Sequence, residues 1–207
     1  MADAPAIAWY FDVVSPFSYL ALPSVESLAA RHPVALRPVV LGAILAHWRG
    51  LGPAEVPPKR LHTYRLCQFL ADRAGLPMRF PPRHPFRSLD AQRLLATLGP
   101  SIAEVRTAFD FVWREGRDPG DPAEFAVLRG RLAAPDPADA KDALRRATDE
   151  AIAAGVFGVP TLQVGAELFW GFDAAPMAEA FLGNSTLFAR GEMARLPGLP
   201  VGVERRR

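Results

Sequence analysis

The sequence has a single cysteine, Cys67, among its 207 residues, and this scarcity excludes several classes of protein. One thiol cannot form an internal disulfide, so a disulfide-stapled secreted domain and dithiol exchange by the chain alone are both ruled out. No window reaches the roughly 18 consecutive apolar residues of a transmembrane helix. The first residues, MADAP, include an acid and no basic cluster, so they do not indicate a secretory signal. We therefore expect a cytoplasmic protein.

Lysine is almost absent as well, occurring only at Lys59 and Lys141, and the formal net charge is +2. This small charge and the dispersed basic residues argue against nucleic acid as a partner. Histidine is also scarce, and its positions have no metal-ligand spacing, which predicts surface or packing roles and no metal site. The four histidines are His32, His47, His62 and His84. Cys67 falls in a predicted helix, where cysteine is usually a small buried hydrophobe.

The first forty residues carry the clearest pattern in the chain. Residues 7–14, IAWYFDVV, are apolar, aromatic and β-branched, as expected of a strand buried on both faces. Ser15 can cap a helix over 17–31, with Pro16 at its first position. Residues 34–41 then predict a second strand, parallel to the first. Ser15 would lie at a helix N-terminus, which favours an anion such as a thiolate.

The turn itself reads Ser15-Pro16-Phe17-Ser18, the outline of a thioredoxin-type Cys-Pro-x-Cys site with hydroxyls in place of both sulfurs. Cys67 is far away in the sequence. Any sulfur handled at this turn must therefore come from a bound molecule. The alternative interpretation is that Ser15 is only a helix cap.

A second informative stretch begins with Val159-Pro160-Thr161. Proline suits the first residue of a strand, so residues 162–164 and 168–170 predict a hairpin around Gly165 and Ala166. The Val-Pro-Thr sequence favours a cis bond, which would leave the Val159 backbone as a pairing edge for a peptide-like ligand. The alternative is a trans proline that merely opens a strand.

No strand pattern is present between residues 42 and 158. Helical spacing there predicts helices over 43–48, 59–74, 88–98 with Ser88 as cap, 102–115, 121–132, and from Asp136 or Asp139 to 154. A proline-rich loop spans 76–86, and Asp173 or Ala174 begins a further helix through Phe181. The order predicts an α/β chain with a β-containing domain at 1–42 and 156–207 and a helical insertion domain at 43–155.

These motifs together resemble the 2-hydroxychromene-2-carboxylate isomerases, which are close relatives of kappa-class glutathione transferases and distant relatives of DsbA oxidoreductases. The resemblance covers essentially the whole chain, from Ser-Pro-Phe-Ser-Tyr-Leu at 15–20 to Trp-Gly-Phe-Asp at 170–173. It implies a thioredoxin-like fold with an all-helical domain between the second and third strands, and glutathione as cofactor. It also implies isomerisation of a 2-hydroxychromene-2-carboxylate-like compound to trans-o-hydroxybenzylidenepyruvate in aromatic degradation, with a homodimer as the common assembly.

The resemblance also assigns roles to residues. Ser15 is the catalytic residue, stabilising the glutathione thiolate. The residues expected to bind glutathione are Ser15, Phe17, Val159, Pro160, Gly171, Phe172 and Asp173. Those expected to bind a small aromatic carboxylate substrate are Lys59, Tyr64, Arg65, Phe86 and Arg87. Asp173 has an alternative role as the cap of the helix that follows it.

Phe172 and Ala174 depart from the family pattern, which usually has a small polar residue and an arginine at these two positions. Two alternatives therefore stay open. One is a kappa-class-like glutathione transferase or peroxidase, which would consume glutathione. The other is a DsbA-shaped protein without catalysis, which would use the Val159 edge to hold peptides or small ligands.

Overall fold

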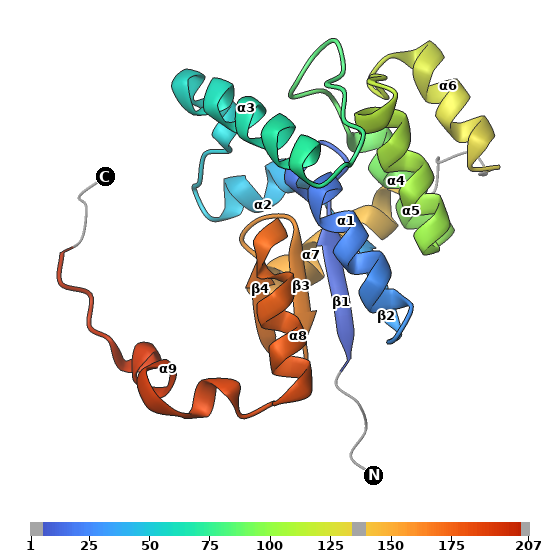
Figure 1. The fold of residues 1–207 in the computed structure, drawn as a ribbon. Helices are drawn as coiled ribbons and strands as arrows, with labels where there is room; N and C mark the ends of the chain where they lie inside the picture. The colour runs from blue at the N-terminus through green and yellow to red at the C-terminus, as the bar shows by residue number, and fades with distance from the viewer. Residues whose placement is uncertain (1–5, 134–139, 204–207) are drawn as a thin grey trace.

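The structure, a computed structural model, describes residues 6–133 and 140–203 and contains a four-stranded mixed sheet (Figure 1). The strands are β1 (Ile7–Phe11), β2 (Val34–Pro38), β3 (Thr161–Val164) and β4 (Glu167–Trp170), and their spatial order is β2-β1-β3-β4. β1 pairs parallel with β2, as predicted, and antiparallel with β3, which forms the expected hairpin with β4. Strands from both ends of the chain therefore form one sheet.

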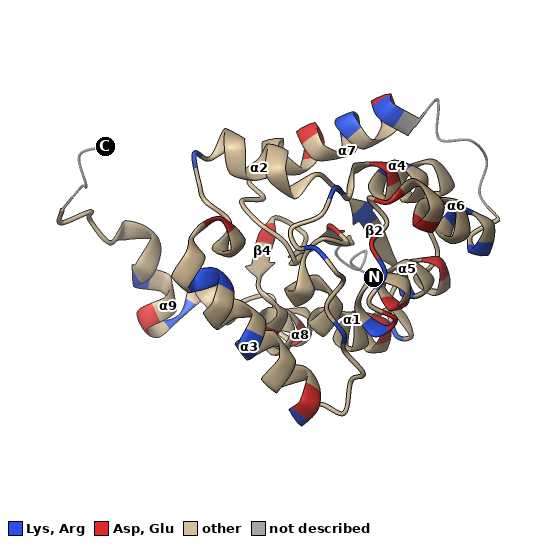
Figure 2. Cartoon of the chain, turned by 90° about the horizontal axis from the view of Figure 1, so that it is seen from above, with Lys and Arg blue, Asp and Glu red and all other residues tan. Residues whose placement is uncertain are grey.

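Helices cover both faces of this sheet and fill the middle of the chain. They are α1 (Pro16–Ala29), α2 (Leu41–His47), α3 (Pro57–Arg73), α4 (Leu89–Leu98), α5 (Ile102–Phe109), α6 (Pro122–Arg131), α7 (Ala140–Ala153), α8 (Ala175–Gly183) and α9 (Gly191–Arg195). Figures 1 and 2 show α1 and α8 on one face of the sheet and α2 and α7 on the other. The described part of the segment 42–158 contains helices and no strand, so the order β-α-β, helices, β-β-α is confirmed. The division into two domains stays a prediction.

Alternation along β1 builds two hydrophobic cores. Ile7, Trp9 and Phe11 point into the larger core, where the rings of Trp9 and Phe11 stack with centroids 4.6 Å apart. Tyr10 points to the opposite face, into a smaller core that includes Val159. Successive side chains of a strand point to opposite faces. The predicted strand buried on both faces is therefore confirmed.

Several predicted boundaries are wrong in detail. Both parallel strands end three residues earlier than predicted, because residues 12–14 turn into α1 and residues 39–40 lead into α2. The helix predicted over 102–115 is α5 followed by a π-helical turn at Asp110–Arg114. The predicted start of α7 at Asp136 or Asp139 lies outside the described residues.

Ser88 occupies the predicted N-cap position of α4 without a capping hydrogen bond, and Asp173 is not the cap of α8. Ser88 precedes α4 with helical backbone angles and makes no side-chain capping hydrogen bond. Its hydroxyl instead bonds to the buried carboxylate of Asp12. Asp173 lies inside a short 3₁₀ turn at Phe172–Ala174, and the residue that precedes α8 is Ala174. Both errors arise because a capping residue type also suits tertiary hydrogen bonds and turns.

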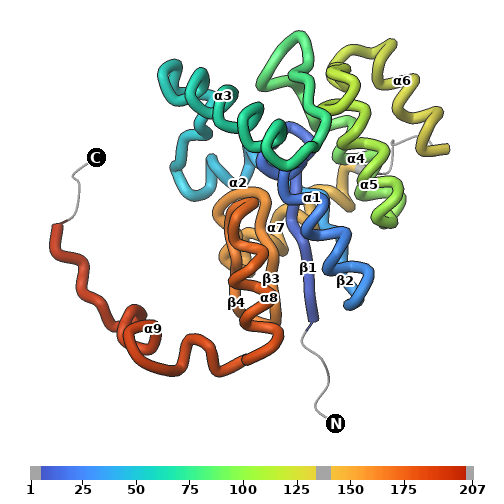
Figure 3. The backbone as a smooth tube through the Cα atoms, in the orientation of Figure 1, coloured from blue at the N-terminus to red at the C-terminus, as the bar shows by residue number. Residues whose placement is uncertain are grey.

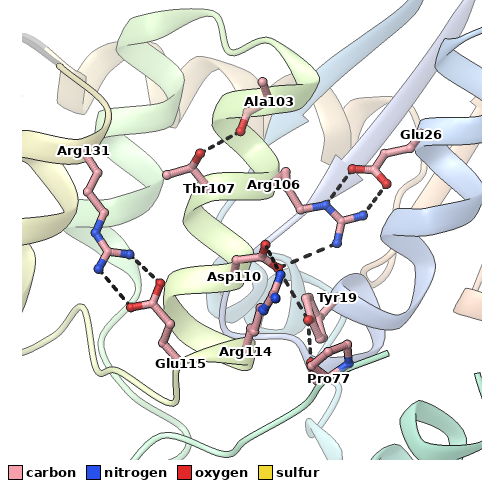
Figure 4. A network of polar contacts seen from close by, with 10 residues as sticks. All are labelled: Tyr19, Glu26, Pro77, Ala103, Arg106, Thr107, Asp110, Arg114, Glu115 and Arg131. Carbon is pink, nitrogen blue, oxygen red and sulfur yellow. Dashed lines mark hydrogen bonds and ion pairs between the residues drawn. The ribbon is translucent and has the colours of Figure 1, made fainter. Parts of the chain in front are cut away.

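Ion pairs join the helical middle of the chain to α1 (Figure 4). The guanidinium of Arg106 on α5 forms a two-pronged contact with the carboxylate of Glu26 on α1. Asp110 contacts both Arg106 and Arg114 at 3.7 Å. The hydroxyl of Tyr19 on α1 donates a 2.7 Å hydrogen bond to the carbonyl of Pro77. These contacts hold α1 against residues that follow it by 58 to 91 positions.

The C-terminal segment 191–203 is exposed throughout and extends away from the sheet (Figures 1 and 3). Acidic and basic residues are interspersed on α7 and α9, as Figure 2 shows. Among the described helices, none combines the length and apolarity needed to cross a bilayer.

One buried amide ties the helical middle to the sheet. Gln92 on α4 is fully buried, and its NH₂ group donates to the carbonyls of Phe11 and Val39 at 2.9 and 2.8 Å. Its side-chain oxygen accepts from the N–H of Val13 at 3.3 Å. Because β1 ends at Phe11 and β2 ends one residue before Val39, the amide joins the ends of both strands to the turn that leads to α1.

We predict that Gln92→Met lowers the free energy of unfolding by about 3 kcal/mol, because buried groups left unpaired cost about 1 to 3 kcal/mol each. Urea unfolding measures the change. Gln68→Met is the matched control, since among the described residues the Gln68 amide bonds only to Asp72 on the surface of α3, and its effect should stay within about 0.5 kcal/mol. Equal losses in the two variants would show that the buried amide adds no special stability.

Candidate functional site

Ser15 caps α1 as predicted. Its backbone is extended, Pro16 occupies the first helical position, and its Oγ accepts from the N–H of Ser18 at 3.3 Å. Ser15 is only 5% exposed. Because the oxygen accepts this bond, the hydroxyl proton can be donated to another acceptor at the helix N-terminus. A hydroxyl donor placed beside unpaired N–H groups and the positive end of the helix dipole stabilises an anion.

A buried carboxylate shapes the turn that leads to Ser15. Asp12 is 1% exposed, and its two oxygens accept from the N–H groups of Val14 and Leu41, each at 3.0 Å. The backbone N–H of Ser15 donates to the Asp12 carbonyl at 2.9 Å. Burial raises the pKa of the Asp12 carboxyl, against the opposing effect of these hydrogen bonds. Asp12 therefore links the turn before α1 to the start of α2.

The second predicted loop lies next to this turn. The Val159–Pro160 bond is cis, as the sequence favoured. The last pair of β1 and β3 joins Tyr10 to Thr161, so Pro160 and Val159 continue the line of β3 beyond its pairing with β1. The side chain of Val159 is buried in the smaller core. The Pro160 carbonyl accepts from the N–H of Gly171 at 2.9 Å, which holds the two predicted glutathione loops together.

An aromatic stack closes the link between the loops. The rings of Phe17 and Phe172 lie 5.6 Å apart at an interplanar angle of 13°. Phe17 follows Ser15 by two residues, and Phe172 follows Gly171 directly. The structure therefore brings together most of the residues predicted to bind glutathione: Ser15, Phe17, Val159, Pro160, Gly171 and Phe172. Phe172, a departure from the family pattern, packs against the turn of Ser15.

Gly171 holds Asp173 in a folded turn. The φ angle of Gly171 is +110°, and a β-carbon added there would lie 2.6 Å from a carboxylate oxygen of Asp173. A side chain at Gly171 would therefore displace the carboxylate. Asp173 is exposed and does not cap α8, so its carboxylate is available to a ligand.

Only some of the residues predicted to bind substrate lie close to one another. Tyr64 is half-buried on α3 and Phe86 is 9% exposed in the larger core. Both contact the ring of His84, with centroid distances of 5.2 and 6.1 Å. Within the described chain, no ion pair, hydrogen bond or ring contact joins Lys59, Arg65 or Arg87 to these aromatic residues.

The three predicted cationic residues differ in their surroundings. Lys59 and Arg65 are exposed on α3, and Arg87 is exposed and pairs with Asp90 at 3.3 Å. Within the described ranges, Lys59 and Arg65 form no ion pair, whereas the guanidinium of Arg87 is engaged by Asp90.

Sequence reasoning missed the side chains that hold the Ser15 turn. His84 was expected to have only a surface or packing role, but its Nε2 lies 2.8 Å from the carbonyl of Val14. The indole N–H of Trp113 donates to the carbonyl of Val13 at 2.8 Å. Gln92 and Asp12 complete this set, which we call the turn clamp: Asp12, His84, Gln92 and Trp113. The sequence feature that could have indicated these buried contacts is a polar residue within an apolar stretch, as at Asp12 and Gln92.

Other groups take no part in this site. Cys67 is fully buried, as predicted, and burial raises the pKa of its thiol to about 12. At neutral pH it stays protonated and has little nucleophilicity. Among the described residues, no group of three or more His, Cys, Asp or Glu side chains could hold a metal ion.

Comparisons with known proteins agree with this geometry. Residues 6–183 match the DSBA-like thioredoxin domain family. The chain is 32% identical over 195 residues to a 2-hydroxychromene-2-carboxylate isomerase of Sphingobium xenophagum, covering 85% of this chain and 97% of that protein. It is 26% identical over 187 residues to glutathione S-transferase kappa 2 of Caenorhabditis elegans, covering 79% of this chain and 83% of that one.

A solved structure of a 2-hydroxychromene-2-carboxylate isomerase superposes with a TM-score of 0.72 at 25% identity, covering 93% of this chain and 98% of that chain. Fold and sequence thus agree, and the thioredoxin-like fold expected from the sequence is confirmed. The relatives support an isomerase acting on a small molecule. The chain belongs to the DsbA-like thioredoxin family and, within it, to the 2-hydroxychromene-2-carboxylate isomerases.

Proposed function

We propose that the protein is a glutathione-dependent isomerase that interconverts a 2-hydroxychromene-2-carboxylate-like compound and trans-o-hydroxybenzylidenepyruvate in aromatic degradation. The observation that carries the proposal is the position of the Ser15 hydroxyl at the N-terminus of α1, beside the cis-proline loop. The chain has no second cysteine with which to form a dithiol, so the reacting thiol comes from glutathione. Reduced glutathione fits a cytoplasmic location.

Ser15 acts on the thiol through charge stabilisation. A hydrogen bond from its hydroxyl to a thiolate is charge-assisted and contributes roughly 1.5 to 3 kcal/mol. This corresponds to a lowering of the thiol pKa by about one to two units. A thiol with an ordinary pKa near 8.5 then becomes substantially ionised at neutral pH. Ser15 therefore stabilises the thiolate and is not itself a nucleophile.

The loops around Ser15 supply contacts for the rest of glutathione. The backbone of Val159 continues the line of β3, so the cysteinyl backbone of the tripeptide can pair with it as an added strand. The exposed carboxylate of Asp173 can accept from the γ-glutamyl ammonium group. Phe17 and Phe172 form an apolar wall between these two contacts.

The thiolate then adds to the conjugated ring system of the substrate, which turns a double bond into a single bond. Rotation about that bond and elimination of the thiolate give the trans product and return glutathione. Tyr64 and Phe86 provide the aromatic side of the substrate site, and Lys59, Arg65 and Arg87 are the cations available for its carboxylate. A planar aromatic acid needs this combination of apolar and cationic groups.

A kappa-class-like glutathione transferase is the second candidate, because the nematode kappa protein matches 79% of this chain. A transferase forms a conjugate that leaves, whereas an isomerase regenerates its thiol. Counting product molecules per glutathione separates the two: many turnovers at substoichiometric glutathione support the isomerase, and one conjugate per glutathione supports the transferase.

We predict that Ser15→Ala raises the pKa of bound glutathione by about one to two units, because the charge-assisted hydrogen bond is lost. The thiolate's ultraviolet absorbance followed against pH measures the shift, and calorimetry measures binding. Ser18→Ala is the matched control. Ser18 lies in the same turn, and its buried hydroxyl has no hydrogen-bond partner among the described residues.

The Ser18 variant should leave the thiol pKa within about 0.3 units of the wild type. Equal pKa values for glutathione on the wild-type protein and on Ser15→Ala would remove Ser15 from the mechanism. No binding at millimolar glutathione would remove both enzymatic candidates and leave a binding protein of thioredoxin-like shape.

A second prediction concerns the turn that holds Asp173. Gly171→Ala places a β-carbon against the Asp173 carboxylate and should weaken glutathione binding about tenfold, the loss of one charge-assisted hydrogen bond. Gly183→Ala at the end of α8 is the control, because nothing lies within 4 Å of its added β-carbon. Calorimetric titration of both variants tests the prediction, which a tight-binding Gly171→Ala protein would refute.

A further inference from the structure

His84 and Tyr64 form a hydrogen-bonded chain that ends at the peptide group before Ser15. His84 Nε2 lies 2.8 Å from the Val14 carbonyl oxygen, and His84 Nδ1 lies 2.7 Å from the Tyr64 hydroxyl oxygen. The same hydroxyl oxygen lies 2.8 Å from the backbone carbonyl of His84. The His84 imidazole and the Tyr64 phenol therefore make three polar contacts, one with each other and two with backbone carbonyls.

The two carbonyls determine where the protons lie. A carbonyl oxygen only accepts, so Nε2 must carry a proton and donate it to Val14. In the neutral imidazole Nδ1 is then an acceptor, and the single proton of the Tyr64 hydroxyl is shared between Nδ1 at 2.7 Å and the His84 carbonyl oxygen at 2.8 Å. The oxygen of Tyr64 is consequently left with lone pairs for an incoming donor. Tyr64 therefore presents an acceptor to a ligand hydroxyl when His84 is neutral.

The protonated form of His84 fits the same positions. When Nδ1 carries a proton it donates to the Tyr64 oxygen, and the Tyr64 hydroxyl donates to the His84 carbonyl. All three contacts are then proper donor–acceptor pairs. The site can thus accept a proton at His84 without moving any of these groups.

The surroundings return the imidazole to its neutral form. The rings of Tyr64, Phe80, Phe86 and Trp113 lie around His84 with centroid distances between 5.2 and 6.3 Å. This burial lowers the pKa of His84, with the hydrogen bond to Val14 opposing the effect. The charged groups nearby are Arg60, which acts on Tyr64, and Arg83, which is paired with Asp118 at 2.7 Å.

We propose that Tyr64 and His84 form a proton relay that opens the cyclic hemiketal of the substrate, with Tyr64 contacting the substrate and His84 holding the proton. This inference rests on the proposed function, because the hemiketal belongs to the proposed substrate. Its central carbon is the carbon of the 2-hydroxychromene that bears both the ring oxygen and the hydroxyl. The relay works beside the thiolate site and needs no further reactant.

The step balances in atoms and charge. The hemiketal hydroxyl gives its proton to the Tyr64 oxygen while the Tyr64 proton moves to His84 Nδ1. The bond between the hemiketal carbon and the ring oxygen breaks, its electron pair goes to the ring oxygen, and a ketone forms. His84 then returns its proton through Tyr64 to that phenolate oxygen. Both oxygens belong to the same carbon, so one tyrosine can serve both.

Tyr64→Phe tests the relay, because it removes one oxygen and keeps the ring that packs against Phe80 at 4.8 Å. General acid–base catalysis contributes roughly 10²- to 10⁴-fold, so we expect kcat for ring opening to fall at least about 100-fold. Glutathione affinity and the thiol pKa should stay unchanged. Tyr19→Phe is the matched control, since it removes a hydroxyl that also donates a 2.7 Å bond to a backbone carbonyl.

His84→Gln provides a second readout. The glutamine amide can still donate to the Val14 carbonyl but cannot take up a proton at neutral pH. In the wild type, activity should fall on the acid side as His84 becomes protonated and can no longer accept. That acid limb should disappear in His84→Gln, together with a loss of kcat similar to that of Tyr64→Phe.

The substrate for these assays is 2-hydroxychromene-2-carboxylate with substoichiometric glutathione. Thiol-dependent isomerisation by the wild type with less than about tenfold loss in Tyr64→Phe overturns the relay alone. A loss of activity in Tyr19→Phe as large as the loss in Tyr64→Phe also overturns the relay. A wild-type protein that binds glutathione but does not isomerise the chromene overturns the proposed function and the relay with it.

Discussion

The structure depends on how the chain holds the few peptide groups between β1 and α1. Four buried or half-buried side chains, the turn clamp of Asp12, His84, Gln92 and Trp113, bond to the backbone from Phe11 to Val14. Three of them come from the helical middle of the chain. A turn exposed to water would find its partners in solvent, but this one is buried and needs protein partners. The helices thus complete the hydrogen bonding of the sheet's own turn.

This arrangement gives the helical middle a part in positioning Ser15. The orientation of the Ser15 hydroxyl follows from the direction of the peptide groups just before it, and those groups are fixed by α4, the proline-rich loop and the π-helical turn. Rigid positioning of a donor matters because a preorganised dipole stabilises a developing charge without further reorganisation. The side chains that hold the Ser15 turn therefore lie in the helical middle of the chain, which also contains the residues predicted to bind substrate.

The sequence predicted the periodic parts of the fold well. The alternation in residues 7–11, the Ser15-Pro16 cap and the hairpin around Gly165 all depend on local spacing and turn chemistry, which a single sequence contains. The cis bond at Pro160 and the contacts among the loops predicted to bind glutathione were also within reach, because the family motifs mark both loops.

The sequence could not predict which polar residues would turn inward. Ser88 has the residue type of a cap, yet its hydroxyl serves Asp12, and His84 lies in a loop where nothing local indicates a buried partner. Such contacts join residues 70 to 100 positions apart, and their existence depends on the packing of helices against the turn. The ends of both parallel strands were also missed, because residues 12–14 turn into α1 and residues 39–40 lead into α2.

Phe172 shows how a departure from the family pattern can be compatible with the site. A small polar residue there would leave the Phe17 ring without its partner, whereas the observed pair stacks at 5.6 Å and joins the Ser15 turn to the Gly171 turn. Aromatic pairs of this geometry contribute about 0.5 to 1.5 kcal/mol beyond the area they bury. At this position the chain thus has an apolar contact between its own loops, and the Asp173 carboxylate, which the proposed function pairs with the γ-glutamyl ammonium, stays exposed.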